Sequence, residues 1–224
     1  MIPLRDDQPR FSTPYVTYFL IGLNSAIFLF ESALTPESFK TLLFQFGMIS
    51  ANITGYLSAA SGPGLVAVLL PALTSMFLHG SWMHVIGNMW FLWIFGDNVE
   101  DLMGHGGYLI FYLAVGVVAS ATHVLMNKLS TNPLIGASGA IAGVLGAYTV
   151  LFPRARILSL IPLGLFTRFI AIPAFLFLPL WFVMQFVYGL ASLAGTGEGV
   201  AWWAHVGGFI AGIVLVPVFV HRRR

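Results

Sequence analysis

Two polar residues inside apolar stretches of the chain could together act as a nucleophile and a base. Ser138 lies in LIGASGAIAG, and His205 lies in AWWAHVGGFIAG. A serine hydroxyl that is hydrogen-bonded to an imidazole is an activated nucleophile, because the histidine takes the hydroxyl proton during attack and returns it to a leaving amine. The pair therefore predicts hydrolysis of a peptide bond by a Ser138/His205 dyad.

A third polar stretch could stabilise the negative charge that forms during such an attack. The segment TSMFLHGSWMHVIGNMWF carries His84 and Asn88, which a helix places one turn apart on the same face. Both side chains can donate toward the developing oxyanion. The backbone N–H of Ser138 can also donate, since amide groups at a helix start are unpaired. We expect His79, in the same segment, to be structural.

No carboxylate is well placed to orient the His205 ring. Glu198 lies seven residues earlier, in an expected loop. Asp97, Glu100 and Asp101 are expected at the opposite membrane face. The chain has no cysteine, which excludes thiolate catalysis, disulfides and zinc held by cysteine. We therefore expect a dyad without a third member, and neither a metal nor a cofactor.

The composition predicts the scaffold that must position these residues. Hydrophobic residues make up 58% of the chain, charged residues only 8%, and the mean hydropathy is +0.89. Soluble domains carry roughly 25% charged residues, so a water-soluble fold is excluded. Since about 20 apolar residues cross a bilayer as a helix, the pattern predicts an all-α polytopic membrane protein with one domain at 14–220. The six expected spans lie near 14–31, 81–97, 106–126, 136–152, 168–192 and 201–220.

The segments outside the expected spans are short or irregular in composition. Residues 1–13 are expected to form a short cytoplasmic tail and residues 221–224 a basic one. The stretch 32–80 mixes prolines, glycines and polar residues with short apolar pieces. Irregular backbone is tolerated at membrane depth where protein covers it. This stretch is therefore expected to be a long, partly embedded loop.

The positive charges predict the orientation in the membrane. Lys and Arg are enriched in the cytoplasmic loops of membrane proteins. Two arginines precede the first expected span, three lie between the fourth and fifth, and three end the chain, whereas only Lys40 and Lys128 fall on the other side. Both termini are therefore expected in the cytoplasm, and the short tails favour a bacterial plasma membrane. The formal charge of +2 is too small and too scattered for a nucleic-acid groove.

Depth and small residues predict that Ser138 and His205 meet. At 1.5 Å per helical residue, Ser138 lies roughly 24 Å and His205 roughly 26 Å from the cytoplasmic arginines that follow them. Both would then lie a little below the external surface. Small residues four apart let two helices touch. Both spans carry them: Gly139, Ala142, Gly143 and Gly146 on the fourth, and Ala204, Gly208 and Gly212 on the sixth.

Taken together, these residues resemble the rhomboid family of intramembrane serine proteases. The resemblance runs from the second to the sixth expected span. Each motif is common by itself, but the ordered set is specific. The motifs are GASGA around Ser138, the spacing of His79, His84 and Asn88, the GDNVED turn with Glu100, and AHVGGFIAG around His205.

The resemblance implies a six-helix fold in which Ser138 attacks the substrate carbonyl and His205 is the base. Asn88 and His84 match the family's oxyanion-side residues, and His79 matches a loop-anchoring position. The stretch 32–80 would be the embedded first loop, and the fifth span the substrate gate. The matching glycines are Gly136 and Gly139, which flank the nucleophile, and Gly208, which packs closely.

Two positions depart from the family pattern. Some relatives carry an aromatic residue four positions after the nucleophile, against the histidine, where this chain has Ala142. The Trp-Arg pair of many members is absent from residues 32–80. Because Ala142 stands at the position of that aromatic residue, another side chain must hold the His205 ring.

Three functions fit these observations. The first is an endopeptidase that cuts transmembrane protein substrates in or beside their membrane segments, within the lipid bilayer. The second is an inactive rhomboid-like protein that binds membrane proteins, against which the retained Ser138 and His205 argue. The third is a small transporter, which would need polar residues at several depths rather than at one level. The sequence predicts neither the substrate nor the oligomeric state.

Overall fold

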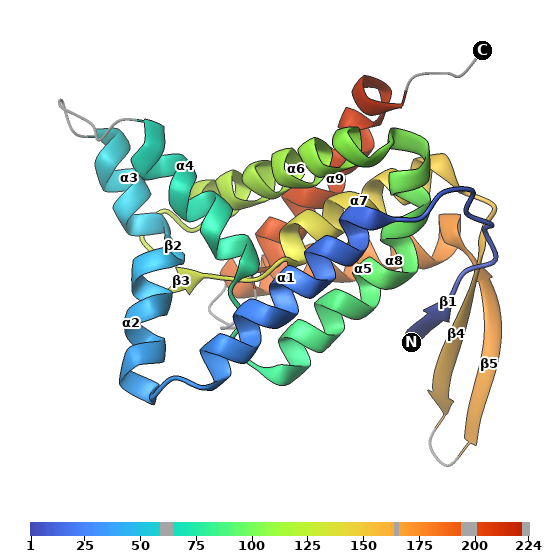
Figure 1. Cartoon of the computed structure of the whole chain (residues 1–224), viewed down its shortest axis with the longest axis horizontal. Helices are drawn as coiled ribbons and strands as arrows, with labels where there is room; N and C mark the ends of the chain where they lie inside the picture. Colours follow the sequence, from blue (N-terminus) through green and yellow to red (C-terminus); the bar gives the residue numbers. More distant parts are fainter. Residues whose placement is uncertain (59–64, 164–165, 194–200, 221–224) are drawn as a thin grey trace.

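The structure is a computed structural model that describes residues 1–58, 65–163, 166–193 and 201–220 (Figure 1). The basic tail at 221–224 and Glu198 lie outside the described residues. The longer helices are α1 (Tyr15–Ser32), α5 (Trp82–Met103), α6 (His105–Met126), α7 (Ser138–Leu151), α8 (Ala174–Leu193) and α9 (Trp202–Phe219). The shorter elements between α1 and α5 are α2 (Pro36–Phe46), β2 (Met48–Ile49), α3 (Ser50–Ser58), α4 (Leu65–Thr74) and the 3-10 helix η1 (Ser75–Phe77). The remaining strands are β1 (Ile2–Arg5), β3 (Pro133–Leu134), β4 (Arg156–Leu163) and β5 (Phe166–Pro173).

Helix α7 is the centre of the bundle. Ten consecutive residues from Gly139 to Tyr148 are buried, and α6 and α9 pack along it. A side chain at Gly212 would overlap the carbonyl oxygen of Gly143, and one at Gly146 would overlap that of Phe209. The small residues therefore bring the backbones of α7 and α9 into direct contact, as their spacing predicted.

The chain is a mostly helical integral membrane protein with four long apolar helices, namely α1, α6, α8 and α9. Helix α7 is apolar but has only 14 residues. Helix α5 has 22 residues and carries Asp97, Glu100 and Asp101 near its end, so it is less apolar than the other four. A helix thus occupies each predicted span, but the prediction of six spans goes beyond the four that length and composition support.

The prediction of an all-α fold is confirmed only in part: the chain is mostly helical, but β1, β4 and β5 form a three-stranded antiparallel sheet in the order β1-β4-β5. Residues 168–173, expected to begin the fifth span, belong to β5, and α8 starts only at Ala174. Hydropathy alone does not separate an apolar hairpin from an apolar helix. The β-branched residues of this segment, such as Ile157 paired with Ile172, favour extended backbone.

The stretch 32–80, expected to be a loop, is largely helical where the structure describes it. Thr35 caps α2 by accepting the backbone N–H of Ser38 at 3.3 Å, and Pro36 occupies the first helical position. Both residues are typical of a helix start. Pro71 lies inside α4. Among the described residues that suggested irregular backbone, Pro36 thus begins a helix and Pro71 lies inside one.

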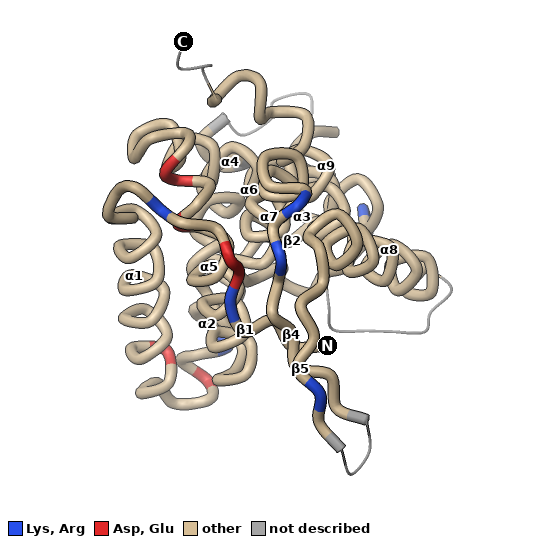
Figure 2. Tube along the Cα trace, turned by 90° about the vertical axis from the view of Figure 1, so that its right-hand side faces the viewer, with Lys and Arg blue, Asp and Glu red and all other residues tan. Residues whose placement is uncertain are grey.

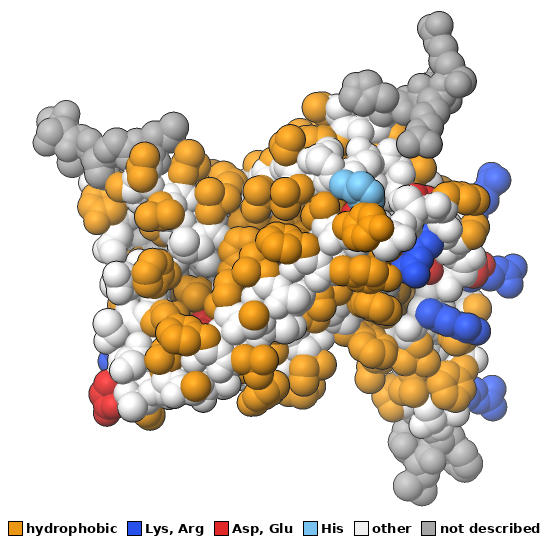
Figure 3. Space-filling model, in the orientation of Figure 1, with side chains coloured by type: hydrophobic (Ala, Val, Ile, Leu, Met, Phe, Trp, Pro, Cys, Tyr) orange, Lys and Arg blue, Asp and Glu red, His pale blue; other side chains and the backbone are white. Residues whose placement is uncertain are grey.

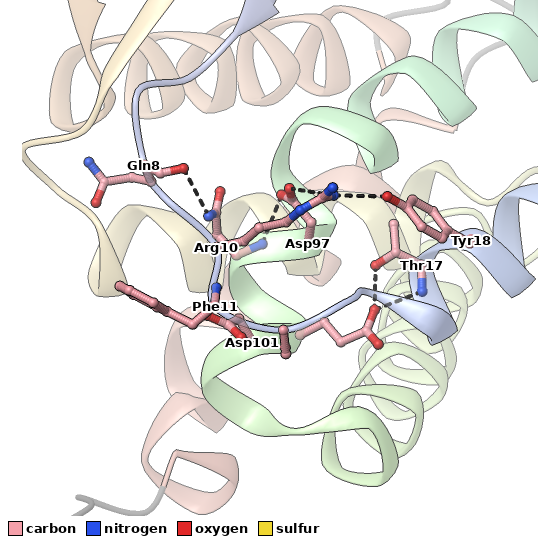
Figure 4. Close-up of polar contacts among 10 residues, drawn as sticks. Gln8, Arg10, Phe11, Thr17, Tyr18, Asp97 and Asp101 are labelled. Carbon is pink, nitrogen blue, oxygen red and sulfur yellow. Dashed lines mark hydrogen bonds and ion pairs between the residues drawn. The ribbon is translucent and has the colours of Figure 1, made fainter.

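The N-terminal segment is fixed to the end of α5 rather than free (Figure 4). Buried Glu100 accepts the backbone N–H groups of Val16 at 2.9 Å and Thr17 at 2.8 Å, and also the Thr17 hydroxyl at 2.7 Å. A carboxylate at a helix start satisfies unpaired amides and complements the helix dipole. His105 Nδ1 lies 2.6 Å from the same carboxylate. Glu100 thus anchors α1 to the helices α5 and α6.

Candidate active site

Ser138 and His205 lie within hydrogen-bond distance of each other. Ser138 is the first residue of α7 and His205 lies in the first turn of α9. The distance from Ser138 Oγ to His205 Nε2 is 2.7 Å. His205 is only 8% exposed. The arrangement can pass a proton from the hydroxyl to the imidazole.

Close packing of two glycines sets this distance. A side chain at Gly208 would overlap the carbonyl oxygen of Gly139, and one at Gly139 would meet the Cβ of Ala119 at 2.8 Å. Both glycines lie within one turn of the dyad. Their lack of side chains lets the starts of α7 and α9 approach until the Ser138 and His205 side chains touch.

Gln185 of α8 holds the other nitrogen of the His205 ring. Its Oε1 lies 2.7 Å from His205 Nδ1, and the amide is buried. The amide oxygen accepts a hydrogen bond from the Nδ1–H group, which leaves the Nε2 lone pair free to accept from Ser138. Trp181, one turn earlier on α8, lies with its ring centroid 6.0 Å from that of His205. These two side chains support the ring where some relatives would use the position of Ala142.

Gln185 is a residue of the site that was not predicted from the sequence. The signal was present, because an amide in the apolar run LWFVMQFVYG is expensive in a membrane helix and marks a functional candidate. Gln185 and His205 are 20 positions apart in the sequence, so no local spacing indicated their contact.

His84 and Asn88 lie beside the loop that leads into Ser138. Gly136 has a φ of +114°, which favours glycine. A side chain there would meet His84 Nε2 at 2.6 Å and Asn88 Nδ2 at 3.7 Å. Ser81 caps α5 by accepting the backbone N–H of His84 at 3.2 Å. The predicted oxyanion-side residues thus face the approach to the Ser138 amide.

His79 contacts the side chain of Asn88 and holds it in position. It is fully buried, and its Nε2 lies 3.0 Å from Asn88 Nδ2. The His79 backbone N–H donates to the Glu31 carboxylate at 3.1 Å. The residue therefore links the end of α1 to α5.

A cavity of about 1040 Å³ contains the site. Ser138, His205, Gln185, His84 and Asn88 all line it. Further polar groups of the lining come from the end of α6 and the segment after it. Those groups are His123, Asn127, Ser130 and Asn132. The cavity can therefore hold water and a peptide backbone inside a membrane protein.

Of the other predicted site residues, Glu100 belongs to the α1 anchor, and Gly139, Gly208 and His79 support the site from outside the lining.

A family model for the rhomboid domain matches residues 67–222, well over half of the chain. The chain belongs to the rhomboid family. The match includes every residue around the cavity, whereas the rhomboid domain model does not reach α1 or the N-terminal strand.

Three curated rhomboid relatives illustrate the range of similarity. Human "Presenilin-associated rhomboid-like protein, mitochondrial" is 34% identical over 110 residues, 48% of this chain and 28% of that protein. "Rhomboid protein 1, mitochondrial" of Saccharomyces cerevisiae is 26% identical over 89% of this chain and 51% of its own length. "Rhomboid-like protein 11, chloroplastic" of Arabidopsis thaliana is 34% identical over 64% of this chain and 50% of its own length. The chain thus spans about a quarter to a half of the rhomboid relatives that it matches.

Proposed function

We propose that this rhomboid protein is an intramembrane serine endopeptidase that hydrolyses peptide bonds in or beside the transmembrane segments of other proteins. The observation that carries the proposal is the 2.7 Å contact between Ser138 Oγ and His205 Nε2 inside a polar cavity of a membrane protein. A serine and a histidine buried in an apolar chain have a desolvation penalty to offset. Their direct contact, with an acceptor on the second ring nitrogen, favours chemistry over packing.

In the proposed reaction, Ser138 Oγ bonds to the substrate carbonyl carbon while its proton passes to His205 Nε2. The C–N bond then breaks, the imidazolium returns the proton to the departing amine, and an acyl-enzyme remains on Ser138. A water molecule then gives a proton to His205 Nε2 and adds to the acyl carbon. The bond from that carbon to Ser138 Oγ breaks, His205 returns the proton to Oγ, and the new carboxyl end of the substrate is released. Gln185 Oε1 accepts a hydrogen bond from the Nδ1–H throughout, so that Nε2 stays the basic nitrogen.

The negative oxygen of the tetrahedral intermediate needs donors aimed at it. We assign this role to the Ser138 backbone N–H, the Asn88 amide and His84. The backbone N–H lies at the start of α7, where helix amides are unpaired. Asn88 and His84 lie beside Gly136 on the same approach.

The cavity predicts the kind of substrate. A helical backbone does not present its carbonyl carbon to a nucleophile, since that carbonyl is hydrogen-bonded within the helix. The substrate segment must unwind locally, which helix-breaking and small residues near the cut would favour. The polar lining residues Asn127, Ser130 and Asn132 could pair with an unwound backbone.

We also propose that the end of the molecule bearing the N-terminus faces the cytoplasm, as in a bacterial plasma membrane. Figure 3 shows Lys and Arg side chains gathered at this end of the visible face. Such a bias sets orientation in membrane proteins. The active site would then open near the external surface.

The test uses purified protein in detergent with a model single-span substrate. Wild type should cut the substrate and react with a fluorophosphonate probe, whereas Ser138→Ala and His205→Ala should fall to background. Ser120→Ala is the matched control, since Ser120 is a buried serine of α6 outside the cavity lining. Equal cleavage by all four proteins would refute the endopeptidase. Substrate binding without cleavage by wild type would point to an inactive binding protein instead.

A further inference from the structure

The hairpin of β4 and β5 has a composition that does not suit water. The 11 residues 157–167 contain no charged side chain, and Arg168 is the single charge between Arg156 and α8. Antiparallel sheets that face water on one side alternate apolar and polar residues. This hairpin lacks that alternation.

Both faces of the sheet carry apolar side chains. On one face Leu160 pairs with Phe169 of β5 and with Ile2 of β1. Phe169 is 63% exposed and Ile2 is 51% exposed. On the other face Ser159 pairs with Ile170, which is 42% exposed. The outer strand therefore exposes apolar side chains on both faces, although Ser159, the partner of Ile170 on β4, is buried.

The hairpin projects from the bundle beside the start of α8, as Figures 1 and 2 show. Its base is closed by the Ala174 N–H, which donates to the Ala155 carbonyl at 2.8 Å. The first turns of α8 expose Phe175, Leu176 and Leu180 by about half of their surface. Since α8 is a long apolar helix of a membrane protein, the exposed apolar surface of the hairpin continues a surface that faces lipid.

The N-terminal segment holds the hairpin in this position. Trp90 of α5 donates its indole N–H to the Pro3 carbonyl at 2.6 Å. Asp7 accepts the backbone N–H of Arg156 at 2.8 Å, and Asp6 accepts the hydroxyl of Tyr148 of α7. The sheet is therefore tied to two helices of the bundle and cannot turn its apolar faces away.

The free edge of the sheet limits how deep the hairpin can lie. Strand β5 is at the end of the strand order, so among the described strands it pairs only with β4. Open sheet edges do not occur in the hydrocarbon core, because unpaired N–H and C=O groups are costly there. In the interfacial zone, water and headgroups can pair with such an edge. Exposed Arg168 suits the same depth, since arginine places its stem among apolar groups and its charge at phosphates.

We propose that the β4–β5 hairpin lies in the interfacial zone of the bilayer leaflet nearest the N-terminus. Phe169 and Ile170 enter the boundary of the acyl chains, and Arg168 contacts lipid phosphate. The hairpin is thus a lipid anchor for the start of α8, the helix that carries Gln185. This proposal rests on the membrane location of the chain and not on the proposed endopeptidase activity.

Depth measurements by spin labelling test the proposal directly. The chain has no cysteine, so single-cysteine variants of the full chain need no background substitutions. We compare nitroxides at Phe169→Cys, at Val183→Cys on the exposed face of α8, and at Lys128→Cys in the exposed turn after α6, in phosphatidylcholine vesicles with phosphatidylglycerol. The label at 169 should be more accessible to oxygen than to a water-soluble nickel complex, at a depth between the other two labels. A label at 169 as accessible to nickel as that at 128 would overturn the proposal.

Two further variants keep the test decisive. If Phe169→Cys does not elute as a folded protein, Ile170→Cys replaces it on the opposite face of the same strand. Arg168→Gln in the 169-labelled protein tests the phosphate contact. Adding phosphatidylglycerol to phosphatidylcholine vesicles should change the depth of the label with Arg168 present and leave it unchanged with Gln. An identical lipid response in both proteins would remove the phosphate contact from the proposal.

Discussion

The α7–α9 contact and the α8 helix place the parts of one site by opposite means. In α9, 56% of the most apolar 18-residue stretch is buried inside the protein. In α8, only 28% of the corresponding stretch is buried. Ser138 and His205 are held where two backbones touch at glycines, but Gln185 reaches the site from a helix that mostly faces lipid. The hydroxyl–imidazole pair is therefore fixed by the core, while the orientation of the imidazole depends on a helix that the core holds weakly.

The largest effect on the site is expected when the backbones of α7 and α9 are forced apart. Gly208→Val places a branched side chain against the Gly139 carbonyl, and overpacking of this kind costs about 1–3 kcal/mol, occasionally more. We expect loss of both fluorophosphonate labelling and thermal stability. Gly22→Val is the control, because nothing lies within 4 Å of a side chain at Gly22. Full labelling of the Gly208 variant would show that the helix contact does not set the dyad.

Asn88 tests the third side of the site, which α5 provides. Removing one oxyanion donor typically lowers turnover by about 10²-fold, or less where donors are redundant. Asn88→Ala should therefore lower kcat on that order without unfolding the protein, measured by cleavage of a single-span substrate and by a melting curve. Asn98→Ala is a control on the same helix, outside the cavity lining. Unchanged kcat in the Asn88 variant would contradict its proposed role.

Loss of Gln185 should affect only the orientation of the His205 ring, so this residue tests how much α8 contributes to the site. A neutral hydrogen bond contributes about 1 kcal/mol, which corresponds to a decrease of roughly tenfold or less in kcat. Gln185→Leu should show this decrease with KM nearly unchanged, since the imidazole can turn away from Ser138 while the cavity stays formed. Gln185→Glu keeps an acceptor at Nδ1 and should retain more activity than Leu. Equal kcat for wild type and Gln185→Leu would show that the core alone orients the ring.

The same contrast explains how far the sequence predicted the molecule. The contact of Ser138 with His205 followed from small residues at spacings of four, because such spacing acts within a helix and is readable along the chain. Gln185 and the β4–β5 hairpin were missed for related reasons. The contact of Gln185 depends on how α8 packs, and the hairpin has the hydropathy of a span although its β-branched residues form strands. The short helices of 32–80 were missed because their caps resemble loop residues.

The smallest expected effect concerns the attachment of the sheet to the N-terminal segment. There the neighbouring carboxyl groups of Asp6 and Asp7 have pKa values shifted in opposite directions. The backbone N–H of Arg156 lowers the pKa of Asp7 below its ordinary 3.8, whereas burial raises the pKa of Asp6 above the same value. Ionised Asp7 therefore stabilises the folded state at pH values above 3.8, and this contribution is lost as the pH falls below that value. Asp6 has the opposite sign, since its protonation favours the folded state as the pH falls through its raised pKa.

These signs give a measurable difference between two variants. Because Asp7 is exposed to solvent, Asp7→Asn should lower Tm by only about 1–2 °C near neutral pH, and the difference from wild type should vanish in acid. Asp6→Asn should instead raise Tm relative to wild type at neutral pH, provided that the amide still accepts the Tyr148 hydroxyl. Melting curves between about pH 3 and pH 7 test both signs. A Tm difference for Asp7→Asn that persists unchanged in acid would mean that the carboxylate charge does not contribute to holding β4.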